Sequence, residues 1–150
     1  MADENTQVRL SPPDIKALVQ EVGDKLEALV KELREGSDYA NIRPSDSKMF
    51  MLISEQPRTI SQLARTLRVS RQAAHASIGR LAQFKIVELQ PAPGSRRDKV
   101  AIITESGHKA QEFAARHTKA IEAALEEKIG KERLETLRGI LMDILSGNLD

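Results

Sequence analysis

The stretch "TISQLARTLRVSRQAAHASIGRLAQF", residues 59–84, decides the fold that the sequence predicts. Its first half has Thr59 as a helix-capping residue, and apolar side chains follow at helical spacing. These apolar positions are Ile60, Leu63, Ala64 and Leu67. Ser70 repeats the capping signal only three residues later, so a second helix is expected to begin there after a short turn.

This second helix has one apolar and one polar face. Ala74, Ile78 and Leu81 recur at spacings of four and three, which places them on the inner face. The opposite face holds Arg71, Gln72, His75 and Gly79. Two short helices joined by about three residues, the second with a cationic outer face, form a helix-turn-helix pattern in which the second helix is the recognition helix.

A short hairpin with a basic tip is expected next. "IVELQ" (86–90) and "KVAIIT" (99–104) are β-branched runs typical of strands, and "PAPGSRRD" (91–98) joins them through prolines and a glycine. The tip and the second strand supply three cations: Arg96, Arg97 and Lys99. A helix-turn-helix followed directly by such a hairpin predicts a winged helix.

Amphipathic helices are expected on both sides of this centre. Residues 44–103 are predicted to form the winged-helix lobe, flanked by helical segments at 11–37 and 104–147, the second of them broken at Gly130. The predicted fold class is therefore mainly α, with about six helices and a small β-hairpin wing. The 150 residues are expected to form a single unit.

Three further caps and two methionines are interpreted from the same patterns. Ser11, Ser45 and Thr104 are the candidate caps of the helices that follow them. Met49 and Met51 are predicted to be core residues rather than the lining of a ligand pocket.

Composition narrows the class of protein. The chain has no cysteine, which excludes disulfides and thiolate metal sites and favours a reducing cytoplasm. No apolar run reaches the length of a membrane span, and the N-terminal residues do not resemble a secretion signal. We therefore expect a cytoplasmic protein with no membrane partner.

The charge is unevenly distributed along the chain. The net charge is only +1, but residues 57–100 carry nine of the lysines and arginines and only two acidic residues, Glu88 and Asp98. Both flanking segments are net acidic. A basic block of this size in a nearly neutral chain indicates that the centre faces a polyanion, most often nucleic acid.

This order of elements resembles the MarR family of bacterial transcription regulators, over about residues 11–147. The resemblance is carried by short motifs: Leu63 and Ala64, Val69 to Gln72, Arg80 and Leu81, Arg96 and Arg97, and Thr104 with Gly107. It implies that the terminal helices form a homodimer, that the dimer binds a palindromic operator, and that a small effector binds between those helices and the lobe. The residues do not identify the effector or its contacts.

Three positions depart from the family's pattern. Ser95 stands where the family's wing has an aspartate, so the usual carboxylate partner of a wing arginine is absent. Arg68 and Lys85 stand where the family often has glycine. If these two positions need a positive φ, each side chain costs roughly 1 kcal/mol or alters the turn.

Six residues of the recognition helix are candidate DNA contacts. Arg71 and Gln72 lie at its N-terminal end, where Arg pairs with guanine and Gln with adenine, and His75 one turn later can donate or accept a hydrogen bond. The candidate phosphate contacts are Ser70, Ser77 and Arg80. The alternative is that the exposed polar residues are merely solvated, and this alternative is strongest for His75.

The wing supplies the other candidate DNA contacts, Arg96, Arg97 and Lys99, which are expected to reach the minor groove or its phosphates. The alternative is that these charges only keep an exposed hairpin edge from aggregating. His108 and His117 lie nine residues apart and do not form a metal site. The sequence contains no catalytic or cofactor-binding motif, so neither an enzyme nor a cofactor is expected.

The leading hypothesis is a homodimeric, sequence-specific regulator that binds double-stranded DNA and acts as a ligand-responsive repressor. Two alternatives stay open: a winged-helix module that binds an acidic protein, and a nonspecific DNA-coating protein. Arginines and a glutamine gathered at the start of the recognition helix favour the first hypothesis over both.

Overall fold

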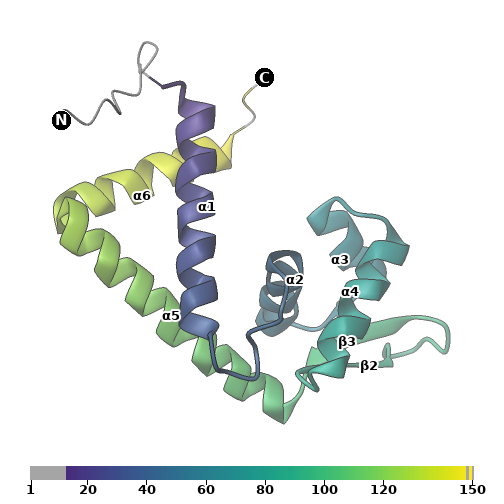
Figure 1. Ribbon diagram of the computed structural model, residues 1–150. Helices are drawn as coiled ribbons and strands as arrows, with labels where there is room; N and C mark the ends of the chain where they lie inside the picture. The colour runs from purple at the N-terminus through teal and green to yellow at the C-terminus, as the bar shows by residue number, and fades with distance from the viewer. Residues whose placement is uncertain (1–12, 148, 150) are drawn as a thin grey trace, which may run out of the picture.

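The computed structural model describes residues 13–147 and 149, and within them the chain forms a winged-helix lobe and a helical arm (Figure 1). The elements are α1 (Ile15–Arg34), α2 (Pro44–Glu55), β1 (Arg58–Thr59), α3 (Ile60–Leu67), α4 (Arg71–Gln83), β2 (Val87–Pro91), β3 (Lys99–Ile103), α5 (Glu105–Ile129) and α6 (Lys131–Ser146). These six helices and one small sheet confirm the predicted mainly α fold class.

The caps predicted in and after the helix-turn-helix are confirmed. The Thr59 hydroxyl accepts from the Gln62 backbone N–H at 3.1 Å, and the Gln62 side chain accepts from the Thr59 N–H at 2.9 Å, which completes a capping box at α3. Ser70 caps α4 and Thr104 caps α5, each accepting from the N–H three residues later. The start of the recognition helix is therefore determined by local hydrogen bonds.

Two predicted caps differ from the structure. Ser11 lies outside the described residues, and α1 is capped instead by the Asp14 carboxylate. Ser45 is not a cap, because α2 begins one residue earlier at Pro44 and the capping position falls on Arg43. Proline is well suited to a first helical position, since its fixed φ is already helical and its missing N–H would have no partner there.

The sheet has one strand more than the predicted hairpin. β2 and β3 pair antiparallel with Leu89 opposite Ala101, and β1 joins the other edge of β3 with Thr59 opposite Val100. β1 is only two residues long, so it has no alternation of polar and apolar residues by which a sequence could reveal it.

The core of the lobe lies between α2, α3, α4 and the sheet. The predicted inner face of α4 is confirmed, because Ala74, Ile78 and Leu81 are completely buried. They pack in one cluster with apolar residues of the neighbouring elements, including Met49, Ile53, Leu63, Ile86, Val87 and Ala101. This core fixes α4 by one face and leaves its opposite face outward.

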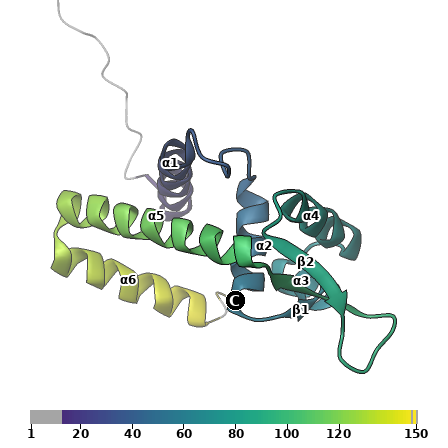
Figure 2. The same cartoon turned by 90° about the horizontal axis from the view of Figure 1, so that it is seen from below.

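The arm is formed by α1, α5 and α6. α5 leaves the lobe and α6 folds back along it after Gly130, while α1 crosses the pair and is seen nearly end-on in Figure 2. Arg138 of α6 forms an ion pair with Glu122 of α5. Leu134 is the buried apolar residue of α6, whereas most of the other apolar side chains of α6 are exposed.

Strain is expected at Lys85, one of the two non-glycine residues with positive φ in the described chain. Its φ is 62°, and that of Arg68 is 55°, as the resemblance suggested for positions that often carry glycine. Because glycine adopts this conformation without a Cβ clash, we expect Lys85→Gly to raise the free energy of unfolding by about 0.5–1 kcal/mol. The melting temperature would rise by roughly 1–4 °C.

The matched control is Lys85→Ala, measured in the same thermal melt. Alanine removes the lysine side chain beyond Cβ but keeps the strain, so its melting temperature should stay near or below that of the wild type. Equal stabilisation by glycine and alanine would show that the side chain, and not the backbone conformation, is the source of the effect.

Candidate nucleic-acid interface

The N-terminal half of α4 presents a polar, exposed surface. Arg71, Gln72 and His75 are all exposed, whereas Ala74 and Ile78 of the same helix are buried. The structure therefore brings together the three residues predicted to read bases. Ser70 is exposed as well, although its hydroxyl already accepts from the N–H of Ala73 at 3.0 Å.

The N-terminal end of α4, which is the positive end of the helix dipole, also lies at this surface. The first backbone N–H groups of a helix carry a partial positive charge and bind anions such as phosphates. The contacts predicted for Ser70, Arg71, Gln72 and His75 stay predictions, but nothing in the described chain covers these side chains.

The structure contradicts one of the predicted DNA contacts, that of Ser77. Only 6% of the residue is exposed, and its hydroxyl donates a hydrogen bond of 2.6 Å to Oδ1 of Asp46 in α2. The prediction that Ser77 contacts a phosphate is therefore wrong, because the side chain faces the interior between α2 and α4. Ser77 lies between the exposed and the buried positions of the helix. At such a position the sequence does not indicate whether a serine side chain points outward or inward.

Arg80 shares the same buried partner. Its Nε and one terminal nitrogen donate to the two oxygens of Asp46 at 2.8 and 2.9 Å, a bidentate ion pair between α2 and α4. Burial raises the pKa of Asp46, but the hydrogen bonds from Arg80 and Ser77 outweigh it and hold this pKa below its usual value. Two donors of Arg80 are thus already occupied, and its contact with DNA stays a prediction.

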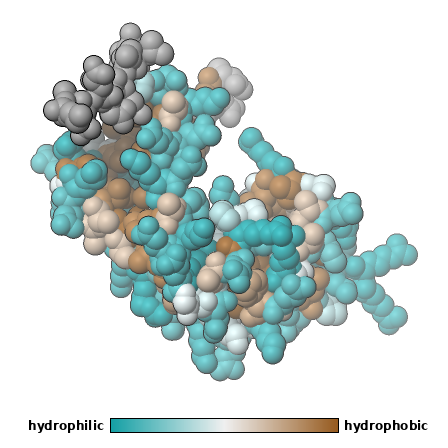
Figure 3. Space-filling view, viewed as in Figure 1, coloured by the Kyte–Doolittle hydropathy of each residue, from teal (hydrophilic) through white to brown (hydrophobic). Residues whose placement is uncertain are grey.

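The wing extends from the sheet as an exposed loop. Arg96, Arg97 and Lys99 are all exposed, and the hydrophilic tip projects from one side of the lobe in Figure 3. Gly94 has a φ of 77°, which glycine adopts readily, so it allows the tight turn at the tip. Within the described chain, no carboxylate lies within ion-pair distance of these three cations.

Ser95 binds the backbone of the wing loop and not the side chain of a wing arginine. Its hydroxyl accepts from the backbone N–H groups of Arg97 at 3.3 Å and of Asp98 at 3.1 Å. These bonds shape the loop, but they leave the arginine side chains without a fixed partner. The lobe thus has two exposed cationic surfaces, one at the start of α4 and one at the wing.

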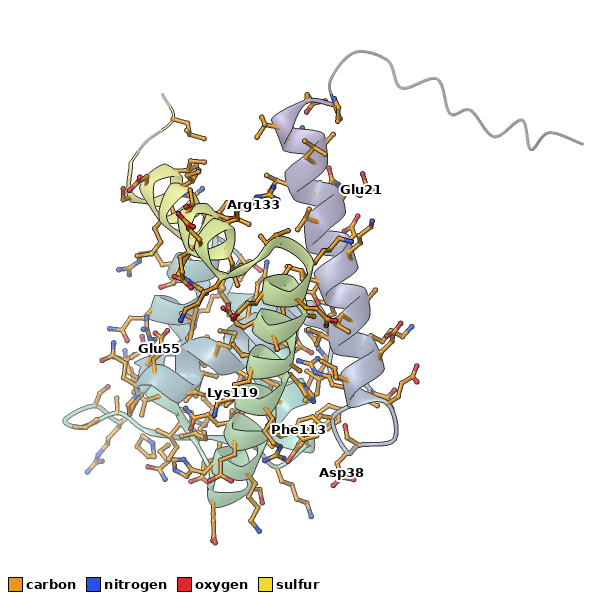
Figure 4. The ribbon with its side chains drawn as sticks, turned by 90° about the vertical axis from the view of Figure 1, so that its left-hand side faces the viewer. Glu21, Asp38, Glu55, Phe113, Lys119 and Arg133 are labelled. Carbon is orange, nitrogen blue, oxygen red and sulfur yellow. The ribbon has the colours of Figure 1, made fainter. Side chains whose placement is uncertain are left out.

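A cavity of about 280 Å³ lies outside these surfaces, where α1, α2 and α5 meet. Its wall is mostly apolar and aromatic, with Tyr39 and Phe113 rings 5.0 Å apart and the His117 ring edge-on to Phe113 at 4.2 Å. Figure 4 shows Phe113 of α5 close to the loop that carries Asp38. The ionisable side chains of the wall are Glu27, Arg34, Lys48 and His117.

One prediction is corrected at this cavity, and one residue there was missed by the sequence. Met49 is buried in the core as predicted, but Met51 is 64% exposed and lines the cavity, because it lies on another face of α2. The sequence assigns no role to His117 or His108, but His117 lies half-buried in the cavity wall, whereas His108 is exposed. Burial, followed by the nearby charges of Arg34 and Arg116, lowers the pKa of His117.

The fold and these two surfaces define a winged helix-turn-helix protein. Residues 42–98 match the sequence profile described as the MarR family. A search of the curated proteins finds no match.

Several solved structures share the fold. FabT of Streptococcus pneumoniae in complex with DNA has a TM-score of 0.75 at 17% identity, with 88% of this chain and 93% of that one covered. MarR of E. coli in its apo form has 0.73 at 20%, with 91% and 99% covered. RV1404 of Mycobacterium tuberculosis has 0.72 at 18%, with 94% and 99% covered. The chain is thus similar to the MarR family over residues 42–98, and it shares the fold of these solved structures over most of its length.

Proposed function

We propose that the chain is a sequence-specific regulator of transcription that binds double-stranded DNA through α4 and the wing. The observation that carries this proposal is the exposed group Arg71, Gln72 and His75 at the N-terminal end of α4, on the same lobe as the exposed wing cations. FabT, which shares the fold, was solved in complex with DNA. In this arrangement α4 enters the major groove and the wing reaches the adjacent minor groove.

The protein acts as a homodimer in this proposal. The arm exposes apolar side chains of α1 and α6, and Figure 3 shows brown, apolar atoms gathered over the arm. Monomeric proteins rarely leave such a surface uncovered, and a twofold dimer is the commonest way to cover it. Two recognition helices about 34 Å apart, one turn of DNA, then match the two halves of a palindromic operator.

Repression that responds to a small ligand is the finer part of the proposal. The cavity between the arm and the lobe supports it, since its apolar walls suit a ligand with an aromatic body, and the cations of Arg34 and Lys48 outnumber the one carboxylate of Glu27 and so favour an anionic group. A ligand that binds better to the spacing that does not fit the operator lowers DNA affinity. The predicted cytoplasmic location and the expected lack of catalytic activity stay predictions; no helix among the described residues is long and apolar enough to cross a membrane.

The test begins with fragments of genomic DNA. The wild type should select a few of them, and the best becomes the operator for titrations against salt. Arg71→Ala should reduce discrimination between operator and nonspecific DNA by about 5- to 150-fold, the value of one good side chain–base pair. Arg97→Ala should weaken binding to all DNA evenly and reduce the salt slope by about one.

Lys119→Ala is the control, since Lys119 is an exposed cation in the middle of α5 (Figure 4), a helix that runs away from α4 and the wing (Figure 1). It should leave affinity and salt slope unchanged. Even binding to every fragment would favour the nonspecific DNA-coating protein. No binding to any fragment at low salt would reject the DNA-binding proposal and leave the protein-interaction module as the better hypothesis.

A further inference from the structure

The first turn of α2 contacts the recognition helix and the cavity at the same time. Asp46 and Ser47 are neighbours in this turn, and their side chains have partners in different parts of the molecule. Asp46 is bound by Ser77 and Arg80 of α4, whereas Ser47 is bound by Arg34 of α1. A displacement of this turn therefore changes both its contact with α4 and its contact with α1.

The contact with α4 is buried and saturated. Asp46 is only 2% exposed, and its two oxygens receive three hydrogen bonds of 2.6–2.9 Å from Ser77 and Arg80. Charge-assisted, bidentate bonds of this kind fix orientation as well as distance. Because Ser77 and Arg80 lie three residues apart on one side of α4, Asp46 constrains the rotation of α4 about its own axis and its tilt against α2.

The contact with the cavity is weaker and open to competition. Arg34 donates to the Ser47 hydroxyl at 3.0 Å and to the Ile42 carbonyl at 3.4 Å, and all three residues line the cavity. Both acceptors are uncharged. An anionic group in the cavity would bind Arg34 more strongly than they do and release the first turn of α2 from α1. Burial, opposed by the charge of Glu27, lowers the pKa of Arg34.

We propose that Asp46 is a positioning residue for DNA reading, and that the first turn of α2 transmits changes at Arg34 to the tilt of α4. This inference rests on the proposed DNA-binding function. Asp46 does not touch DNA; it acts through Ser77 and Arg80, which hold the base-reading end of α4 in register. Arg34 acts one step further away, through Ser47.

The first test is Asp46→Asn, with operator affinity, nonspecific DNA affinity and melting temperature measured together. The amide keeps the size of the side chain but loses the charge and one acceptor oxygen. We expect discrimination between operator and nonspecific DNA to fall about tenfold, a coupling of ordinary size. A merely structural role would lower the melting temperature and leave the discrimination of the folded protein unchanged, which would overturn the proposal.

Glu55→Gln is the matched control. Glu55 is also a carboxylate of α2 paired with an arginine, Arg58, but it is exposed and lies at the far end of the helix, away from α1 (Figure 4). It should leave discrimination unchanged. If Asp46→Asn does not fold, Ser77→Ala removes only one of the three bonds, and it should lower discrimination in the same direction by a smaller factor.

The second test is a double-mutant cycle on operator binding with Arg34→Met and Asp46→Asn. Arg34→Met alone should change operator affinity by about three- to tenfold, although Arg34 lies across α2 from α4. If the effect passes through Asp46, the double variant should be no weaker than Asp46→Asn. Multiplicative effects, within about twofold, would show independent sites and overturn the transmission. If the wild type selects no fragment, the proposed function itself fails, which is a different result.

Discussion

Changing Leu141 and Leu145 of α6 to aspartate should convert a dimer into a monomer and abolish tight operator binding. Leu141 is 41% and Leu145 is 83% exposed, so two carboxylates there are solvated in a monomer. In a dimer they would be buried without partners, which is costly. Because one half-site then binds alone, operator affinity should fall by about 10²–10⁴-fold. Sedimentation equilibrium at micromolar concentration gives the mass, and a titration gives the affinity.

Lys119→Asp is the control for charge. It changes the net charge by the same two units on the exposed side of α5, but it does not alter the apolar surface of α1 and α6. It should leave the protein dimeric with wild-type operator affinity. A wild type that sediments as one chain would contradict the dimer proposal, and so would a leucine variant that stays dimeric.

The apolar surface concerned is defined by residues of the two terminal helices. On α1 these are Ile15, Leu18, Val19 and Val22, and on α6 they are Leu137, Ile140, Leu141, Ile144 and Leu145; all are at least 38% exposed. α6 passes behind α1 in Figure 1, so both sets lie at the same end of the arm. The spacing of these apolar residues makes the helices predictable from the sequence, but it does not show what covers the exposed part of each apolar face.

The helix-turn-helix was predictable because its determinants are local. Thr59 and Ser70 cap α3 and α4 through bonds to residues three positions later, and the inner face of α4 follows the helical period. The positive φ of Arg68 and Lys85 was predictable from the family resemblance, since those positions often carry glycine. Short-range rules of this kind need no knowledge of tertiary structure.

The network around Asp46 was not predictable for the opposite reason. An aspartate in the first turn of a helix interacts favourably with the helix dipole whichever way its side chain points. The residue type at position 46 alone therefore does not indicate burial. Its partner Arg80 is 34 positions away in the chain. The sequence therefore predicts phosphate contacts for both Ser77 and Arg80, whereas in the structure both donate hydrogen bonds to Asp46. The same difficulty applies to Met51 and His117, whose exposure depends on how α1 and α5 pack against the lobe.

The structure gives a physical reason for the glycine at position 107. It belongs to the pattern formed with Thr104, and it lies in the first turn of α5. A Cβ atom built there would lie 2.1 Å from the Ile86 carbonyl oxygen and 2.4 Å from Cγ1 of Ile103. That oxygen is itself fixed, because it accepts from the Thr104 N–H at 3.2 Å. The helix therefore approaches the backbone that follows α4 more closely than any side chain allows.

Gly107→Ala should accordingly destabilise the protein strongly. The contact is with backbone, which cannot rotate away, so the start of α5 must move off the sheet and break the bonds that Thr104 makes to Lys85 and Ile86. We expect a loss of about 3–5 kcal/mol, at the upper end of overpacking effects. The melting temperature should fall by roughly 6–20 °C, measured by circular dichroism.

Gly79→Ala is the matched control, because Gly79 also lies within a helix but has nothing within 4 Å of its added Cβ. Alanine is the better helix former, so this variant should be about 0.5–1 kcal/mol more stable than the wild type. Opposite signs at the two glycines would show that the close approach of α5, and not helix propensity, governs position 107. Since the first turn of α5 packs against the segment that follows the recognition helix, Gly107→Ala should also weaken operator binding in the fraction that stays folded. Two equally small changes in stability at positions 79 and 107 would contradict this tight junction.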